Sequence, residues 1–195
     1  MFPFRYLVKY IMHQISGSGK PEEENLFADF YNLVLKNDGA QPPAWIEEAR
    51  TNLYKNRDFL KPHAFGAGSR QKRRNPTVGA MARTVTISSH HGALLFRLAR
   101  HYKPVKIIEL GTAMGISTLY LSAGNPEAAI ITVEGNLQMA SLAAENFRIC
   151  GSSKIRLLNK TFDDVIDHLV AEAGAGALIY IDGNHTYEAT LRYYQ

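Results

Sequence analysis

The stretch KIIELGTAMGIST, from Lys106 to Thr118, decides the fold of this 195-residue chain. It completes an apolar run over residues 105–110, which predicts a buried strand, and Gly111 and Gly115 then mark a turn into a helix. Glycine at such a turn lets the backbone bend tightly and approach a ligand closely, because it has no Cβ. We therefore expect a strand, a turn and a helix in succession, with a ligand at the turn.

Further apolar runs follow with the same rhythm, at Ala129–Val133, Ile155–Leu158 and Ala177–Ile181. Helical patterns near 115–122, 137–150 and 163–172 separate them. Strands that alternate with helices of this length predict right-handed crossovers and a parallel sheet with helices on both faces. The fold class expected is α/β, with a doubly wound, mostly parallel, Rossmann-like sheet. Ligands of such sheets bind beyond the carboxyl ends of the strands.

A helical extension is expected before this sheet. Apolar residues recur at helical spacing in the first fifteen residues and in 26–35, 44–54 and 91–102, whereas 56–76 has the glycines, prolines and charges of a loop. The predicted organisation is therefore a helical extension with a basic loop over residues 1–90. The ligand-binding α/β core follows over 91–195, incomplete after its fourth strand.

The first fifteen residues are the only segment with some features of a targeting signal. Arg5 and Lys9 interrupt its apolar run, and no small-residue cleavage site follows. No transmembrane segment is expected, because a span needs about 18 uninterrupted apolar residues. The apolar stripe favours a helix that packs on this domain or on a second subunit of a homodimer, with interfacial membrane binding as the alternative.

Composition indicates one globular domain in a reducing compartment. The chain is 46% hydrophobic and 21% charged, and its single cysteine, Cys150, cannot form an internal disulfide, which favours the cytoplasm. The formal net charge is +4, and basic residues cluster at Arg70–Arg74. Such a run more often forms a solvated loop than a phosphate contact, so no nucleic-acid partner is expected.

The residues at the turn exclude a dinucleotide site and favour a nucleoside site. The fingerprint G-x-G-x-x-G would need glycine where Ala113 and Ile116 stand. The second apolar run instead ends in Glu134, 23 residues after Gly111. A carboxylate there can accept hydrogen bonds from both hydroxyls of a ribose. The alternative is an exposed acid at the end of a strand.

The fourth apolar run ends in a group of polar residues with catalytic chemistry: Asp182, Asn184, His185 and Tyr187. A carboxylate, an amide, an imidazole and a phenol at one strand end are hard to explain by packing. Because strand ends of a parallel sheet carry its ligands, we expect these side chains near the reaction centre.

Together these motifs resemble a known family. E-x-G-x-x-x-G, from Glu109, is similar to motif I of class I S-adenosylmethionine-dependent methyltransferases, and D-G-N-H-x-Y, from Asp182, is similar to the fourth-strand motif of small-molecule O-methyltransferases. With FGAGS, LLFRLA and TVEGN added, the chain resembles an O-methyltransferase-like bacterial family found mainly in Bacteroidetes. The resemblance implies S-adenosylmethionine as cofactor, bound by Glu109, Gly111, Thr112, Ala113, Gly115, Ser117, Glu134, Gly135, Thr161, Phe162 and Asp182.

The activity implied is methyl transfer to the hydroxyl of a small molecule. A hydroxyl acceptor needs a base, and His185 is the candidate, because histidine titrates near neutral pH; hydrogen bonding to a neighbouring loop is its alternative role. Asp182 would hold the cofactor-side loop, orient His185 or bind a metal. No metal is assigned, because O-methyltransferases that use one take further ligands after a fifth strand, beyond residue 195.

Other functions compete with this expectation. A non-catalytic S-adenosylmethionine or nucleoside-binding protein would use the same residues. A nicotinamide-dependent dehydrogenase is disfavoured by Ala113, and an aminopropyl transferase would need an acid-rich amine pocket, of which the sequence has no sign. Class I methyltransferases have seven strands and four are recognised here, so we also expect an exposed sheet edge.

Overall fold

A computed structural model describes residues 28, 30–35, 39–61, 76–151, 153–183 and 191. The chain divides into two compact units, residues 1–40 and 41–195. In the first unit the described residues form a short π-helix, η1 (Phe30–Leu35), within the helical pattern expected over 26–35. The apolar stripe of the first fifteen residues and the basic run at 70–74 lie outside the described residues.

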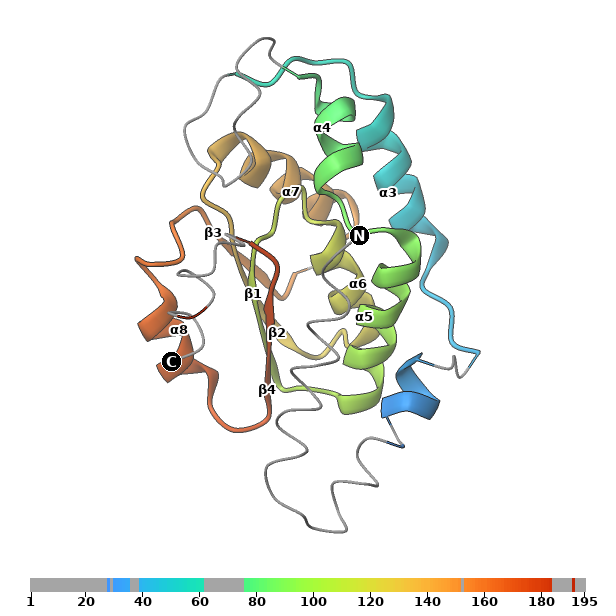
Figure 1. The fold of residues 1–195 in the computed structure, drawn as a ribbon, viewed down its shortest axis with the longest axis vertical. Helices are drawn as coiled ribbons and strands as arrows, with labels where there is room; N and C mark the ends of the chain where they lie inside the picture. The colour runs from blue at the N-terminus through green and yellow to red at the C-terminus, as the bar shows by residue number, and fades with distance from the viewer. Residues whose placement is uncertain are drawn as a thin grey trace. The chain divides into compact units, whose positions relative to one another are not determined.

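The second unit contains a sheet of four parallel strands (Figure 1). These are β1 (Lys106–Leu110), β2 (Ala129–Val133), β3 (Ile155–Leu158) and β4 (Ala177–Ile181), in the order β3-β2-β1-β4. All four predicted strands are confirmed, the first beginning one residue later than expected. The order reverses between β1 and β4, so the carboxyl ends of these two strands flank the crevice where such sheets bind ligands.

Six helices are described in this unit. They are α3 (Ala44–Lys55), α4 (Val78–Val85), α5 (Ser89–Tyr102), α6 (Ile116–Gly124), α7 (Leu137–Ile149) and α8 (Ile166–Ala173). The helix α4 had no counterpart among the predicted elements. It has only eight residues, and Thr77 begins it by accepting a hydrogen bond from the Ala80 N–H at 3.2 Å. The predicted division at residue 90 falls within this compact unit, and it stays a prediction about domain organisation.

Alternate residues of the strands face opposite helical layers. Ile108 and Leu110 of β1 pack with their neighbours on β2 and with Leu169 of α8. Glu109 points to the other face, where Thr118 of α6 donates a hydrogen bond to it. Figure 1 shows α8 on one side of the sheet and α5 and α6 on the other. Helices on both faces are therefore confirmed.

β4 lies at one edge of the sheet as far as the described residues extend. It pairs with β1, and its Ile179 and Ile181 side chains are 43% and 40% exposed. Apolar side chains on an exposed strand edge favour pairing with another strand. None of the helices in the described part of the chain is long and apolar enough to cross a membrane.

Candidate functional site

The turn between β1 and α6 contacts the ends of two neighbouring strands. The N–H groups of Gly111 and Thr112 donate to the carbonyl oxygen of Val133 at 3.0 and 3.1 Å, which ties the turn to the end of β2. Gly111 has φ +113°, and a Cβ there would lie 2.4 Å from the carbonyl oxygen of Asp182. Glycine is therefore required at 111 because the chain leaving β4 passes directly against the turn.

Gly115 is required for a different reason. Its φ is +86°, and a Cβ would lie 2.6 Å from the ring of Phe147 and 3.2 Å from Ala143, both on α7. The second glycine of the motif therefore allows the start of α6 to pack closely on α7. Its contacts in the structure are explained by packing, and a cofactor contact at Gly115 stays a prediction.

Glu134 links the end of β2 to the turn after β1. Its Oε2 accepts a hydrogen bond from the Ala113 N–H at 2.8 Å, and its Oε1 accepts one from the Asn136 N–H at 2.8 Å. Ala113 has φ +47°, which is uncommon for a residue other than glycine. The two strand ends expected to share one ligand are thus in direct contact.

The Glu134 carboxylate keeps capacity for a ligand. Burial raises its pKa, and the backbone hydrogen bonds from Asn136 and Ala113 oppose that rise only in part. A carboxylate has about four lone-pair positions, and two are used by backbone N–H groups. Beside it, a Cβ on Gly135 would meet the Lys160 carbonyl oxygen at 3.8 Å, an ordinary van der Waals contact, so this position could hold a larger residue without a clash.

Glu109 is a fully buried acid beneath the turn. Its Oε2 accepts hydrogen bonds from Thr118 and, at 2.6 Å, from Thr132, while Oε1 has no hydrogen-bond partner among the described residues. Burial raises the pKa of Glu109, and hydrogen bonds from Ser117 and the two threonines act against this. A buried carboxyl oxygen without a partner can still accept a hydrogen bond from a ligand.

Asp182 stands where the chain leaves β4. Its N–H donates to the Leu110 carbonyl oxygen at 2.8 Å, and its Oδ2 accepts a hydrogen bond from the Tyr180 hydroxyl at 2.9 Å. Burial and the nearby Asp182 charge raise the pKa of Tyr180, which keeps this phenol protonated. Tyr180 therefore holds the Asp182 carboxylate in position. His185, the predicted base, lies outside the described residues.

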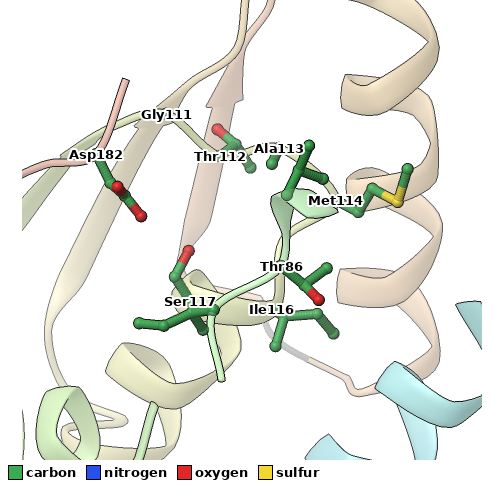
Figure 2. Close-up of a pocket in the computed structure, with 10 residues that line it drawn as sticks. Thr86, Gly111, Thr112, Ala113, Met114, Ile116, Ser117 and Asp182 are labelled. Atoms are coloured by element: carbon green, nitrogen blue, oxygen red, sulfur yellow. The ribbon is translucent and has the colours of Figure 1, made fainter. Parts of the chain in front are cut away.

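A small pocket lies between the turn and the connection from α4 to α5 (Figure 2). It is lined by Val85, Thr86, Ile87, the turn from Gly111 to Met114, Ile116, Ser117 and Asp182. Its enclosed volume is about 20 Å³, room for a group the size of a water molecule. In this structure a ligand as large as a nucleoside would therefore extend outside the pocket. No group of three or more His, Cys, Asp or Glu side chains suited to a metal ion occurs in the stretches that are described.

Residues 108–195 match the family model described as a methyltransferase domain. The matched stretch begins within β1 and covers 88 of the 195 residues. A catechol O-methyltransferase of Niastella koreensis is 30% identical to the chain over 103 residues, which covers 51% of this chain and 47% of the relative. The chain thus spans about half the length of this curated relative.

Solved structures share the fold of this chain. The SAH-bound methyltransferase PaMTH1 of Podospora anserina matches with a TM-score of 0.58 and 19% identity over 90% of this chain and 64% of that one. The O-methyltransferase of Bacillus cereus in complex with SAH matches with a TM-score of 0.51 and 21% identity over 58% and 55%. The predicted Rossmann-like methyltransferase fold is confirmed.

Two residues predicted to contact the cofactor lie away from the pocket. The Thr161 hydroxyl donates to Asp164 at 2.6 Å, and Phe162 packs on the apolar cluster between the sheet and α8. A Cβ on Gly183 would lie 2.6 Å from the Phe162 ring. The structure therefore gives these residues local packing and capping contacts, and their contact with an adenine stays a prediction.

Sequence reasoning missed one wall of the pocket. Val85, Thr86 and Ile87 precede the part of the chain that matches the domain model, and no motif marks them. The available signal is Ser88, a helix-starting residue that accepts a hydrogen bond from the His91 N–H. It predicts the start of α5, but the position of this segment against the turn is a property of the folded chain.

Proposed function

We propose that the protein transfers a methyl group from S-adenosylmethionine to the hydroxyl of a small molecule. The observation that carries the proposal is the contact of Glu134 at the end of β2 with Ala113 in the turn after β1. This contact makes the two predicted cofactor elements parts of one site. A catechol O-methyltransferase and SAH-bound methyltransferases of the same fold support the same class of reaction.

The residues present fit an adenosyl cofactor in charge and position. Glu134 would accept hydrogen bonds from the two ribose hydroxyls through the lone pairs that its backbone contacts leave free. The amino-acid end would approach the turn, Ser117 and Asp182, which line the pocket.

When bound, S-adenosylmethionine supplies the methyl group, which its sulfonium makes reactive. The task of the chain is to hold the acceptor oxygen in line with that methyl group and to receive the proton of the hydroxyl. His185 is the proposed base. Asp182, held by Tyr180, would orient the acceptor side of the site.

The proposal also covers the location of the protein in the cell, its oligomeric state and the acceptor to test first. A single cysteine agrees with a cytoplasmic protein. The apolar stripe of the first fifteen residues supports a homodimer. A catechol or a related aromatic diol is the first acceptor to test, because the curated relative bears that name.

Transfer of labelled methyl groups tests the activity. The chain is incubated with radiolabelled S-adenosylmethionine and a panel of catechols, and label in the organic extract is counted. We expect transfer to at least one catechol and a rate lower by about 100-fold or more in His185→Ala, the contribution usual for a general base. Calorimetric binding of S-adenosylhomocysteine without any transfer would instead indicate a non-catalytic binding protein.

A further inference from the structure

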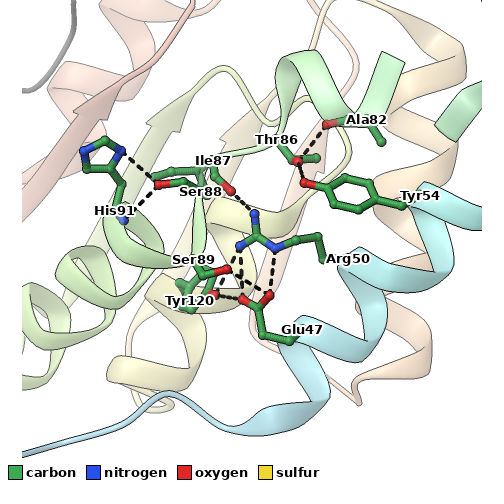
Figure 3. Close-up of polar contacts among 10 residues, drawn as sticks. All are labelled: Glu47, Arg50, Tyr54, Ala82, Thr86, Ile87, Ser88, Ser89, His91 and Tyr120. Atoms are coloured by element: carbon green, nitrogen blue, oxygen red, sulfur yellow. Dashed lines mark hydrogen bonds and ion pairs between the residues drawn. The ribbon is translucent and has the colours of Figure 1, made fainter. Parts of the chain in front are cut away.

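A polar cluster joins α3 to the α4–α5 connection and to α6 (Figure 3). At its centre is Arg50, whose side chain is 6% exposed. Arg50 Nη1 donates to the carbonyl oxygen of Ile87, in the wall formed by the α4–α5 connection. Its Nη2 donates to the Tyr120 hydroxyl at 3.1 Å, on the helix that begins directly after the glycine turn. One guanidinium thus joins both sides of the pocket.

Glu47 completes the cluster and fixes the orientation of the guanidinium. Its carboxylate lies 3.1 Å from Arg50 Nε and accepts hydrogen bonds from Arg50 Nη2 at 3.2 Å, from the Ser89 hydroxyl at 3.0 Å and from the Tyr120 hydroxyl. Burial and the hydrogen bond to Glu47 raise the pKa of Tyr120 to about 12, so this phenol stays a donor at neutral pH. The cluster therefore holds one arrangement of donors and acceptors.

A second contact from the same helix reaches the same wall. Tyr54 lies one turn after Arg50 on α3, and its hydroxyl is 3.1 Å from the Thr86 hydroxyl. The Thr86 hydroxyl in turn donates to the Ala82 carbonyl oxygen at 2.7 Å. Residues four apart lie on one face of a helix, so α3 holds this wall at two consecutive residues, Thr86 and Ile87.

Stability alone is a weak reason for this arrangement. The Arg50 side chain is buried but the Glu47 side chain is 45% exposed, so water screens their attraction and the desolvation of the guanidinium offsets part of it. The pair therefore contributes little net stability. What such a pair does supply is a single geometry. Here that geometry fixes Ile87, which lines the pocket, relative to Tyr120, which lies one turn beyond the pocket-lining residue Ser117 on α6.

We infer that Arg50 is a positioning residue for cofactor binding, which acts by holding Ile87 and α6 at the separation that the amino-acid end of the cofactor requires. The inference rests on the proposed function. The contribution of Arg50 to affinity is assigned to the amino-acid end of the ligand, because the pocket includes Ile87, Ser117 and Asp182 but not Glu134. A ligand that lacks the amino-acid end should not depend on Arg50.

Two ligands separate positioning from general stability. S-adenosylhomocysteine has both the nucleoside and the amino-acid end, whereas 5′-methylthioadenosine has only the nucleoside end. We expect Arg50→Met to weaken S-adenosylhomocysteine binding about tenfold, because the pocket loses its preorganisation, and 5′-methylthioadenosine binding by less than about twofold. Arg50→Lys should restore little, because an ammonium cannot reproduce the fork of donors. Affinities are measured by calorimetry well below the melting temperature of each variant.

The matched control is Arg148→Met. Arg148 also pairs with a glutamate three residues earlier on a helix, Glu145, but its side chain is 72% exposed and lies away from the pocket. Both ligands should bind this variant as they bind the unmodified chain. If Arg50→Met does not fold, the two ligands are compared in Tyr54→Phe, which removes the hydrogen bond between Tyr54 and Thr86. We expect this variant to bind S-adenosylhomocysteine about threefold more weakly and 5′-methylthioadenosine with unchanged affinity.

The outcomes distinguish the inference from the proposed function. An unmodified chain that binds neither ligand overturns the proposed function, and the inference falls with it. If the unmodified chain binds both ligands and the folded Arg50→Met variant binds S-adenosylhomocysteine with unchanged affinity, the inference is overturned and the proposed function stands. Equal losses for both ligands would also overturn it, because they would mean that Arg50 supports the whole domain.

Discussion

Replacement of Glu134 by alanine removes the acceptor that joins the ends of β1 and β2. The change removes the partner of two backbone N–H groups, both at 2.8 Å, and the positions proposed for two ribose hydroxyls. A hydrogen bond to a charged group contributes about 1.5–3 kcal/mol, but water replaces part of this because Glu134 is only partly buried. We therefore expect S-adenosylhomocysteine to bind more weakly by about 1–3 kcal/mol, or about 5- to 150-fold.

Calorimetric titration with S-adenosylhomocysteine measures this loss. Glu127→Ala is the control, because the Glu127 side chain is 87% exposed and its carboxylate contacts Lys154 at 2.7 Å on the surface. The control should bind as the unmodified chain does. If folded Glu134→Ala and Glu127→Ala bind with the same affinity, Glu134 does not contact the ribose and the nucleoside site lies elsewhere.

Two further predictions concern the turn and the acid beneath it. Gly111→Ala should lower the free energy of unfolding by about 2–4 kcal/mol. The added Cβ would lie 2.4 Å from the Asp182 carbonyl oxygen, and the backbone at this position has a φ of +113°. A loss below about 1 kcal/mol, measured by urea unfolding, would contradict the described path of the chain. Burial raises the pKa of Glu109 above its ordinary 4.5, so the folded chain binds the carboxyl proton more tightly than the unfolded chain does. The stability that the protonated side chain contributes is therefore lost as the pH rises through the pKa of the folded state. The stability of Glu109→Gln relative to the unmodified chain should thus increase from about pH 5 to pH 8, by about 1.4 kcal/mol per unit of raised pKa. Urea titrations across this range measure the difference in free energy of unfolding between the two proteins. If this difference stays constant or falls, the pKa of Glu109 is not raised in the folded chain.

Strand positions could be predicted from local pattern because each strand is a short run made mostly of apolar residues, and β1 and β2 are buried almost throughout. The runs at Ala129–Val133, Ile155–Leu158 and Ala177–Ile181 coincide with β2, β3 and β4. The exception among the buried residues of β1 is Glu109, an acid between Ile108 and Leu110. An acid conflicts with burial, and such a conflict in a strand pattern indicates a candidate functional residue.

Other features could not be predicted, because the residues that explain them lie far away in the sequence. Gly115 has the spacing of a ligand-binding glycine, yet the group that excludes a Cβ there is Phe147, 32 residues later. Arg50 has the appearance of a surface residue on an amphipathic helix. Its partners Ile87 and Tyr120 are 37 and 70 residues away, and no local pattern relates them.

By itself, the sequence determined the order of strands and helices, the α/β class and the acids at two strand ends. These follow from periodicity and from the chemistry of single residues, which are local properties. Only the tertiary structure decided that Glu134 contacts the turn at Ala113, that α8 and α6 take opposite faces, and that Arg50 joins the two walls of the pocket. The physical reason is that these contacts depend on the crossover paths and on close packing, which bring distant residues to within hydrogen-bond distance only when the whole sheet has formed.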